Sequence, residues 1–376
     1  MDILEYESFD ELEDREIRWN QLLSKSLDNN PFLTYEWLTA WWRHYGKGRT
    51  IKIFIAKTRK KGKVTLIAPT MYSTYNILGV KLRKLEFIAT PASDYHTFLL
   101  MNFIESTKVA KPLMEKIVES VTDAECIELK EIPEDSYTSK LLAHLHIKTN
   151  SCETNSKVLS RCPYDILPEN FETVFQTLGS NMRRNLKRWK KQALRDYKVE
   201  FVAYDEIGTV EDAMEIFFEL HRKRWKEKNE LGSFSNDVSK NFHIEVAEAF
   251  AKNGWLALYF LTFNDKPVSA LYSYEYNGKL YAYLSGFDPE YATYRPGHLT
   301  FEYLIKHSVK RGLNEFDFLR GMEEYKNRWK ANVRRNFEFR ILKGGLKTKL
   351  YNWITNSKSC SYLCKEIGKK VSVCDA

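Results

Sequence analysis

Hydrophobic and polar residues along this chain of 376 residues follow two different periods, which divide it into strands and helices. Alternation rich in aromatic and β-branched residues predicts strands, whereas an apolar stripe that recurs every three to four positions predicts helices. We predict strands at 51–57, 64–72, 85–88, 95–101, 126–131, 158–161, 199–204, 255–263, 267–276, 279–285 and 316–319. We predict helices at 9–27, 35–45, 109–121, 139–145, 171–178, 181–197, 210–225, 239–252, 296–311 and 346–354.

The stretch 279–329 organises the rest of the chain. Its strand at 279–285 ends before Pro289, because proline cannot donate to a strand ladder. The turn 295–298 (Arg-Pro-Gly-His) opens a helix, since proline is well tolerated in the first turn. The helix ends at Gly312 and is followed by a second strand and a short helix.

A strand, a glycine turn and a helix N-terminus together make a site for an anion, because free backbone N–H groups and the helix dipole both favour negative charge. The dipole contributes only about 0.3–1 kcal/mol at an exposed position. Binding a ligand at micromolar affinity requires about 8 kcal/mol. The turn alone therefore cannot hold a nucleotide, and needs strand backbone and a pocket beside it.

Composition places the chain among folded globular proteins of two-domain size, with 43% hydrophobic residues and few Pro or Gly. A net charge of +8 permits an anionic ligand but is too diffuse to indicate nucleic-acid binding. The longest apolar run, 256–261, is too short to span a membrane, and the acidic start of the chain does not resemble a secretory signal. We therefore expect a cytoplasmic protein without a transmembrane segment.

The six cysteines form no Cys-x-x-Cys pair and show no zinc-type spacing. Free thiols in a reducing compartment are favoured over disulfides or a metal site. The cysteines are Cys126, Cys152, Cys162, Cys360, Cys364 and Cys374.

The stretch 279–329 resembles the coenzyme A site of the GCN5-related N-acetyltransferase (GNAT) superfamily. There, an Arg/Gln-x-x-Gly-x-Gly/Ala loop binds pyrophosphate at a helix N-terminus, and this chain keeps only Arg295-Pro296-Gly297-His298. The order of further motifs resembles the BioF2-like branch, once described as cellulose-biosynthesis acetyltransferases and related to FemAB-type peptidyltransferases. These motifs are Asn30-Pro31-Phe32, Glu36-Trp37, Ser93-Asp94-Tyr95, Arg183-Arg184-Asn185, His221-Arg222-Lys223-Arg224-Trp225, Asp317-Phe318-Leu319-Arg320-Gly321 and Tyr325-Lys326-x-x-Trp329.

The predicted fold is mixed α+β, with tandem GNAT-like domains that each have a mostly antiparallel sheet flanked by helices. Residues 51–129 repeat the element order of 256–318, which indicates a duplication. We expect an N-terminal acetyltransferase-like domain at 1–162, a C-terminal domain with the CoA site at 163–343, and a helical tail at 344–376. The first domain lacks the Arg-Pro-Gly-His turn, so we expect it to have no phosphate site.

The resemblance implies acetyl-CoA or another acyl-CoA as cosubstrate, and no metal. It places the cofactor on the end of one strand and on the turn that follows. The expected cofactor-binding residues are Leu284, Ser285, Phe287, Arg295, Gly297 and His298.

No Gly-x-Ser-x-Gly or other nucleophile motif is present, which favours direct transfer from a thioester to an amine. Asp317, at a strand end, is a candidate base, and the strand backbone near 284–287 would stabilise the oxyanion. Tyr325 is a candidate acid for the leaving thiolate, as in the acetyltransferases it resembles, and Lys326 would hold phosphate or a carboxylate. Simple packing explains Tyr325 and Lys326 equally well, and explains Trp329 better.

Candidate residues for binding the acceptor lie in both halves. His221 and Arg224 end a helix, where cations also complement the helix dipole. Asp94 and His96 would share one face of a strand, with a satisfied loop pair as the alternative.

The helix at 181–197 carries seven Lys or Arg residues between Arg183 and Arg195. Its apolar stripe is Met182, Leu186, Trp189, Ala193 and Tyr197, so the charged face points outward. That face is either simply solvated or guides an anionic substrate.

The function implied is acyl-CoA-dependent N-acetyl transfer to an amine, such as an amino sugar or nucleotide sugar in polysaccharide or cell-envelope synthesis. One alternative is a FemAB-like transferase that uses aminoacyl-tRNA, which would carry an extended helical-hairpin arm. The other is a binding module that kept the fold without the chemistry.

Overall fold

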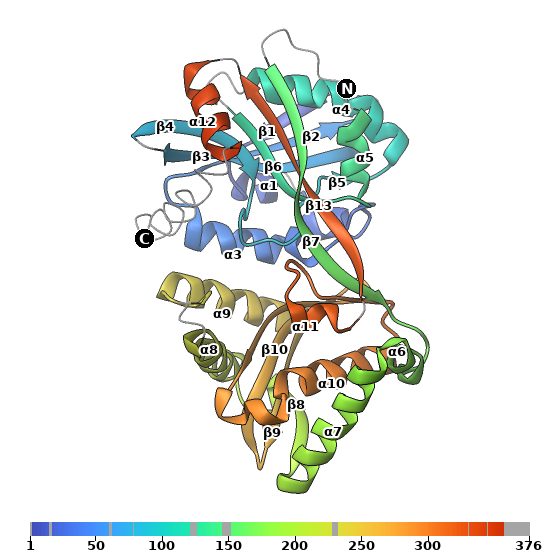
Figure 1. Cartoon of the computed structure of the whole chain (residues 1–376). Helices are drawn as coiled ribbons and strands as arrows, with labels where there is room; N and C mark the ends of the chain where they lie inside the picture. The colour runs from blue at the N-terminus through green and yellow to red at the C-terminus, as the bar shows by residue number, and fades with distance from the viewer. Residues whose placement is uncertain are drawn as a thin grey trace. The chain divides into compact units, whose positions relative to one another are not determined.

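The computed structural model describes residues 2–14, 17–59, 62–77, 79–120, 126–144, 152–227, 232–329, 331–343 and 345–356. The chain forms two compact units (Figure 1). Unit 1 comprises Met1–Leu159 and Asn336–Ala376, and unit 2 comprises Ser160–Arg335.

Unit 1 has a sheet of order β1-β2-β3-β4-β6-β13, with β5 paired to β3. Its strands are β1 (Asp2–Tyr6), β2 (Thr50–Lys57), β3 (Val64–Ile77), β4 (Val80–Phe87), β5 (Leu99–Leu100), β6 (Cys126–Pro133) and β13 (Asn332–Lys343). Its helices are α1 (Asp10–Asp14), α2 (Trp19–Leu23), η1 (Pro31–Leu33), α3 (Tyr35–Tyr45), α4 (Phe103–Ser120), α5 (Tyr137–His144) and α12 (Leu346–Asn356).

Unit 2 has a sheet of order β8-β9-β10-β11-β12-β7. Its strands are β7 (Cys152–Ile166), β8 (Val199–Ala203), β9 (Leu256–Phe263), β10 (Lys266–Tyr276), β11 (Lys279–Phe287) and β12 (Glu315–Asp317). Its helices are α6 (Phe171–Thr177), α7 (Ser180–Asp196), η3 (Tyr204–Glu206), α8 (Val210–Glu227), α9 (Asp237–Lys252), η4 (Pro289–Tyr294), α10 (Pro296–Lys310) and α11 (Glu324–Asn327).

The two units share one strand order and one pattern of direction. In each, four antiparallel strands are followed by one parallel pair, β4 with β6 and β11 with β12, and then by one antiparallel pair. Helices α4 and α10 make the corresponding crossovers between the parallel strands. The predicted fold class, mixed α and β with mostly antiparallel sheets flanked by helices, is confirmed.

The last strand of each sheet comes from a segment that passes from one unit to the other. β7 begins in unit 1, and its end, up to Ile166, pairs with β12 in unit 2. β13 begins in unit 2 and pairs with β6 in unit 1 from Asn336 onward. β7 therefore runs without a break across the domain boundary that the sequence predicted between residues 162 and 163. Residues 336–343, assigned from sequence to the second domain, lie in unit 1.

Local sequence signals account for several element ends. The Thr34 hydroxyl accepts from the Trp37 N–H and caps α3, as a threonine at this position should. Asn277 and Gly278 both have positive φ in the β10–β11 turn, which is the conformation that Asn-Gly favours. The helix predicted at 9–27 is instead two short ones, and of the strand predicted at 95–101 only Leu99–Leu100 forms.

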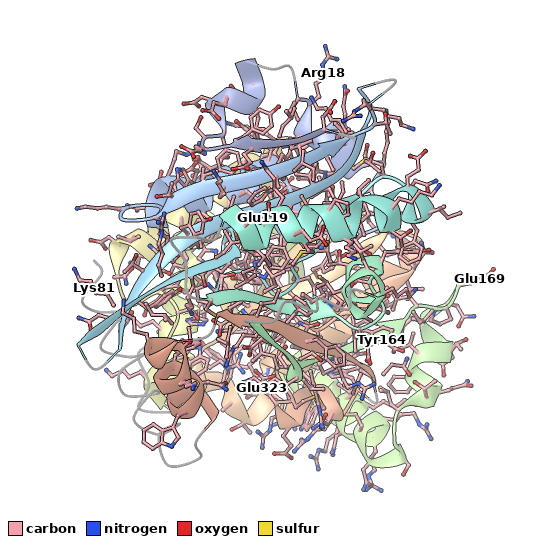
Figure 2. All side chains as sticks on the ribbon, turned by 90° about the horizontal axis from the view of Figure 1, so that it is seen from above. Arg18, Lys81, Glu119, Tyr164, Glu169 and Glu323 are labelled. Atoms are coloured by element: carbon pink, nitrogen blue, oxygen red, sulfur yellow. The ribbon has the colours of Figure 1, made fainter. Side chains whose placement is uncertain are left out.

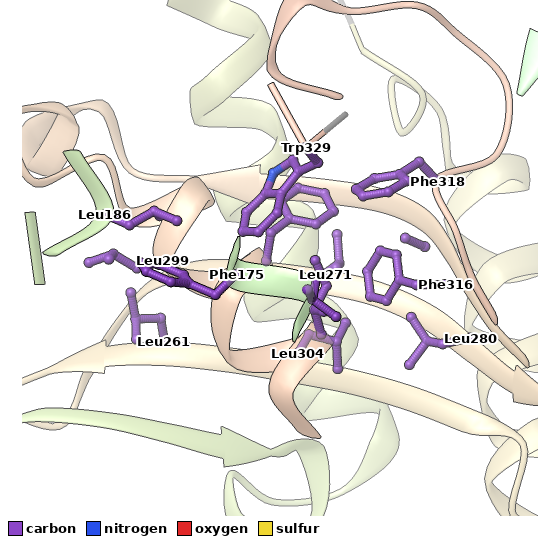
Figure 3. Close-up of a cluster of buried hydrophobic side chains, with 14 of the residues drawn as sticks. Phe175, Leu186, Leu261, Leu271, Leu280, Leu299, Leu304, Phe316, Phe318 and Trp329 are labelled. Atoms are coloured by element: carbon purple, nitrogen blue, oxygen red, sulfur yellow. The ribbon is translucent and has the colours of Figure 1, made fainter. Parts of the chain in front are cut away.

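The sheet of unit 2 is covered on both faces. Helices α8 and α9 pack on one face through rings such as Phe217 against Tyr272 and Phe250 against Tyr274. Helix α10, with α6 and α7, packs on the other face around a core that includes Trp329 (Figure 3). β11 is therefore held between α8 on one face of the sheet and α10 on the other.

Figure 2 shows Glu169 projecting outward at the edge of the ribbon, whereas two carboxylates are fully buried at equivalent places in the two sheets. Glu128 and Asp317 each lie two residues beyond the residue that opens the parallel pair. Each forms an ion pair with an arginine of β13, Glu128 with Arg340 at 2.7 Å and Asp317 with Arg334 at 2.9 Å. A buried carboxylate at this position is therefore a feature of both units.

Candidate active site

Strands β11 and β12 of unit 2 form a fork. They pair in parallel only where Lys279–Tyr281 meets Glu315–Asp317. β12 then ends, while β11 continues to Phe287. Residues 283–285 are partly exposed, although 280–282 just before them are buried. An open strand edge of this kind offers backbone N–H and C=O groups to an extended ligand.

A β-bulge lies in β11 at the opening of the fork. Ser273 of β10 is opposite Ala282, whereas the preceding Tyr272 is opposite Leu284, so Tyr283 is an extra residue. A bulge disrupts the ladder locally and redirects the backbone, and bulges are frequent beside active sites. The expected oxyanion donors, at 284–287, follow this bulge directly.

Helix α8 is held against β11 by a glycine. A Cβ on Gly286 would lie 2.4 Å from the backbone N of His221 and 2.7 Å from the backbone C of Leu220. Contacts this close with backbone cannot be relieved by a side-chain rotation, so only glycine fits. Our sequence reading did not single out Gly286, although a glycine inside a strand is a known signal of close backbone approach.

Arg224, near the end of α8, reaches the open edge of β11. Its Nη1 donates to the backbone O of Ser285 at 3.2 Å and also to the hydroxyl of Ser285. The guanidinium lies 5.6 Å from the ring centre of Tyr325 and 5.8 Å from that of Phe287. The remaining N–H groups of Arg224 find no acceptor among the described residues. Arg224, expected to bind the acceptor, thus lies beside Ser285 and Phe287, which were expected to bind the cofactor. It also lies beside Tyr325, which was expected to be catalytic.

Tyr325 stands on α11, just beyond the end of β12. Its ring is partly buried and packs 5.4 Å from the ring of Phe301 on α10. No described residue hydrogen-bonds its hydroxyl. The ring is therefore fixed by packing while the hydroxyl remains available to a ligand.

Lys326, the next residue, is buried and its ammonium is already engaged. It donates to the backbone O of Arg320 at 2.6 Å and pairs with Glu323 at 3.0 Å. These contacts close the loop after β12. These contacts suit a residue that shapes the loop, and the role in holding phosphate or a carboxylate stays a prediction.

Asp317 is fully buried and accepts hydrogen bonds on both carboxylate oxygens. Oδ1 accepts from the backbone N of Leu319 at 2.8 Å, and Oδ2 accepts from Nη1 of Arg334 at 2.9 Å. Arg334 also pairs with Glu315 at 3.2 Å and lies over the ring of Tyr164. Asp317 therefore holds the end of β12, and its partner Arg334 was not identified from the sequence.

The turn before α10 offers few backbone donors. Arg295 adopts positive φ, its backbone O accepts from the N–H groups of His298 and Leu299, and Pro296 has no N–H. Gly297 contributes the remaining N–H of the turn, and a Cβ placed there would meet nothing within 4 Å. The turn is open, but it supplies one backbone donor where a glycine-rich loop would supply several.

His298 is stacked on Trp189 of α7 at 5.3 Å. Burial, and after it the charges of Arg328 and Arg295, lowers the pKa of His298 to about 4. The ring is therefore neutral at pH 7. It can hold a proton for hydrogen bonding but does not add charge to the turn.

His221 lies in an aromatic cluster behind α8. Its Nε2 accepts from the indole N–H of Trp225 at 2.8 Å, and its ring meets Phe234 edge to face at 4.8 Å. Burial, and then the charge of Arg224, lowers its pKa to about 3. These contacts show that His221 packs within the aromatic cluster. Its role in binding the acceptor stays a prediction.

Asp94 and His96 belong to unit 1 and do not lie on a strand, contrary to our prediction. The backbone O of Asp94 accepts from the side chain of Asn336 at 2.9 Å. His96 stacks on Phe87 at 5.1 Å, and its Nδ1 lies 3.2 Å from the backbone O of Lys130. Both residues thus anchor the segment between β4 and β5 to neighbouring strands.

Helix α7 packs as the pattern predicted. Met182, Leu186, Trp189 and Ala193 are buried. On its outer face most basic side chains are partly or fully exposed, while Lys190 pairs with Glu302 of α10 at 3.7 Å. α7 therefore contacts α10 on one side and presents a cationic face on the other.

Within the described ranges, no group of three His, Cys, Asp or Glu side chains is arranged to hold a metal ion, and no helix is long and apolar enough to cross a membrane. Cys126 and Cys162 are buried and form no disulfide among the described residues, and burial raises the pKa of the Cys126 thiol to about 12. Cys360, Cys364 and Cys374 lie outside the described residues.

The fork, the bulge and the α10 turn occur in one continuous segment. Residues 180–327 match the acetyltransferase (GNAT) domain family. The match begins at the first residue of α7 and ends at the last residue of α11. It therefore includes Arg224, Ser285, the α10 turn and Tyr325. A search of curated protein sequences gave no match.

Solved structures share the fold along nearly the whole chain. The structure of FemX is similar with a TM-score of 0.62 and 11% identity, covering 90% of this chain and 97% of FemX. A conserved protein of unknown function from Bacteroides thetaiotaomicron is similar with a TM-score of 0.53 and 11% identity, covering 86% of this chain and 96% of that protein. The fold is therefore GNAT-like, and at this identity the likeness concerns the fold alone.

Proposed function

We propose that the protein is an acyl-CoA-dependent N-acyltransferase that transfers an acetyl or related acyl group to an amine. The observation that carries the proposal is the meeting of Ser285, Arg224 and Tyr325 at the open edge of β11. The GNAT-domain match over 180–327 supports the same reading. The acceptor would be an amino sugar or nucleotide sugar of polysaccharide or cell-envelope synthesis.

The residues present fit an acyl-CoA. The exposed backbone at 283–285 would hold the extended pantetheine arm by strand-like hydrogen bonds, and the open turn at Gly297 would receive phosphate beside Arg295. When bound, the cosubstrate supplies an activated thioester carbonyl and a thiolate leaving group. Because the turn supplies only one backbone N–H, the open edge of β11 would provide most of the hydrogen bonds to the cosubstrate.

The side chains then divide the chemistry between them. Backbone N–H groups after the Tyr283 bulge would stabilise the oxyanion, and the Tyr325 hydroxyl would give its proton to the departing thiolate. Asp317, the base expected from sequence, is held by Arg334, so we assign it to positioning β12. The acceptor amine would lose its proton to solvent at the partly exposed edge.

Arg224 bears on the choice of acceptor. Its guanidinium is held by Ser285 and flanked by two rings, and its other N–H groups have no described acceptor. A planar guanidinium with free N–H groups binds phosphate or carboxylate in a two-pronged fashion. This favours an amine that also carries an anionic group, as a nucleotide sugar does, over a simple diamine.

Aminoacyl transfer from tRNA remains the alternative, and the cationic outer face of α7 is the observation in its favour. Against it, α8 and α9 both pack on the sheet of unit 2, so this helix pair does not form a free arm.

The test is release of CoA thiol from acetyl-CoA with a panel of amino sugars, their nucleotide derivatives and diamines. We expect turnover with an acceptor that carries both an amine and an anionic group. Transfer from aminoacyl-tRNA in the absence of any CoA release would support the alternative. Binding of CoA without turnover on any acceptor would favour the non-catalytic module.

A further inference from the structure

Helix α12 of unit 1 presents a tryptophan to solvent. The side chain of Trp353 is 62% exposed, whereas Thr348 and Tyr351 on the other side of the helix are buried. Trp353 follows the exposed Lys349 by four residues, so the two side chains are neighbours on the outer face. A single exposed apolar residue is common on protein surfaces, so the groups around Trp353 decide whether the exposure indicates a partner.

The inner face of α12 anchors the helix to the sheet of unit 1. Tyr351 belongs to a small buried cluster with Leu82 of β4 and Leu342 of β13. Its hydroxyl donates to the carboxylate of Glu128 at 2.5 Å. The helix is therefore held in place by its inner face, and the exposed indole of Trp353 is not needed for that packing.

The β3–β4 hairpin brings a second apolar and basic segment to α12. Ile77 pairs with Val80, so a two-residue turn connects the strands and the tip has the sequence Ile-Leu-Gly-Val. Lys81 follows directly and is exposed, at the outer end of the hairpin in Figure 2. The next residue, Leu82, belongs to the same buried cluster as Tyr351 of α12. The base of the hairpin tip and α12 therefore meet within unit 1.

Both segments carry positive charge alone. Residues 74–83 contain one lysine and one arginine and no Asp or Glu, and residues 343–358 contain four lysines and no Asp or Glu. Helix α4 of the same unit is a contrast, because its Ile104 is 68% exposed but is followed by the exposed Glu105. The combination at α12 fits a partner that is anionic at its surface and apolar just beneath. A bilayer with anionic lipids has this structure, since indole rings settle at its headgroup level and lysines are attracted to its charge.

We propose that α12 and the tip of the β3–β4 hairpin dock unit 1 on the surface of an anionic phospholipid bilayer. Trp353 and the apolar tip would enter the headgroup layer, while Lys81, Lys347 and Lys349 would contact lipid phosphates. The inference goes beyond the proposed function and does not rest on it.

Two other occupants fit this surface less well. A second copy of the chain would bring the same positive surface against this one, and like charges repel. Single-stranded nucleic acid binds where several aromatic rings stack successive bases. Within the described part of α12, Trp353 is the one exposed aromatic residue.

The direct test is flotation of the whole protein with lipid vesicles. We expect binding to vesicles of phosphatidylcholine and phosphatidylglycerol in equal parts, and binding weaker by about tenfold or more to phosphatidylcholine alone. High salt should release the protein, because salt screens the attraction of lysines to the lipids. No binding to the anionic vesicles at low salt would overturn the proposal.

Tryptophan emission locates the contact. Lipids brominated on their acyl chains should quench part of the emission of the wild-type protein, which has nine tryptophans. Trp353→Phe keeps an apolar ring, so this variant should still bind vesicles but lose the quenching. Quenching of the same size in Trp353→Phe would overturn the entry of Trp353 into the headgroup layer.

Charge reversal identifies the surface. Lys347→Glu together with Lys349→Glu should weaken binding to the anionic vesicles by about tenfold or more. Lys108→Glu together with Lys111→Glu, at exposed positions of α4, is the matched control and should bind as the wild type does. Equal binding by both double variants would overturn the proposal. So would binding of single-stranded DNA in place of vesicles, or a dimer without lipid that is lost in Trp353→Phe.

Discussion

Asp317 and Arg334 form an ion pair of 2.9 Å in which both side chains are almost wholly buried. In unit 1, Glu128 lies on β6, the strand equivalent to β12, and also forms an ion pair with an arginine of β13, Arg340, at 2.7 Å. Because unit 1 lacks the Arg-Pro-Gly-His turn, the recurrence of the pair indicates a structural part of the fold rather than a catalytic device.

This relationship predicts a large and unequal effect on stability. Arg334→Met would leave Asp317 and Glu315 buried without their shared cation, whereas Asp317→Asn removes one charge and keeps the shape. Removing one partner of a buried pair typically lowers the free energy of unfolding by about 3–5 kcal/mol. Urea unfolding should rank Arg334→Met as the more destabilised. A loss below about 1 kcal/mol in both variants would contradict a structural role for the pair.

Tyr325→Phe should remove the proposed acid without disturbing the packing against Phe301. We expect kcat to fall by about 100- to 10,000-fold with unchanged CoA affinity, because general acid catalysis is usually worth that much. Tyr303→Phe is the control, since Tyr303 also lies on a ring stack, with Phe201, but away from the fork. Unchanged kcat in Tyr325→Phe would remove Tyr325 from the mechanism.

Substitution by alanine should affect the stability of the free protein at Gly286 but not at Gly297. Gly286→Ala would place a Cβ against the backbone of His221, and overpacking of this kind typically lowers the free energy of unfolding by about 1–3 kcal/mol. Gly297→Ala meets open space and should leave the melting temperature of the free protein nearly unchanged, while it weakens stabilisation by acetyl-CoA. Equal melting temperatures for both free variants would show that α8 and β11 are not in close contact.

Acid should destabilise the protein partly through His298. Burial lowers its pKa in the fold to about 4, below the ordinary value of 6.5, so the unfolded chain binds more protons between these values. The free energy of unfolding therefore falls as the pH is lowered through this window, by at most about 1.4 kcal/mol per pH unit from this group. His298→Gln should reduce the slope measured between pH 6.5 and pH 4. A variant with the wild-type slope would mean that His298 is not held neutral.

The cationic face of α7 can be tested by charge reversal. Arg184, Lys187 and Lys191 lie away from the buried stripe, so changing all three to Glu should leave folding intact. If the helix guides an anionic substrate, kcat/KM should fall mainly at low salt, because salt screens surface charges. A loss that is the same at all ionic strengths would argue against guidance, and unchanged kinetics would leave the face simply solvated.

Signals that act within a few residues could be read from the sequence. The Thr34 cap, the Asn277-Gly278 turn and the α7 stripe depend on neighbours in the chain, and each took the predicted form. The repeated order of elements in 51–129 and 256–318 was also visible in the sequence, and the two sheets have the same strand order.

Relationships between distant segments could not be read in this way. The Arg334 partner of Asp317 lies on a strand that the pattern did not reveal, and the paths of β7 and β13 depend on strand pairing across the whole chain. The contact of Lys326 with the backbone O of Arg320 likewise depends on the fold of the loop and could not be predicted. Sequence alone gives the residue types of the site but not which charges are already paired.

The most direct measurement of the central claim is acyl transfer itself. Wild-type protein is incubated with acetyl-CoA labelled in its acetyl group and with a nucleotide amino sugar, and the product is identified by mass spectrometry. The account predicts a labelled N-acetyl product, formed with release of CoA and lost in Tyr325→Phe. Stabilisation by acetyl-CoA with no labelled product from any amine acceptor, or transfer only from aminoacyl-tRNA, would contradict it.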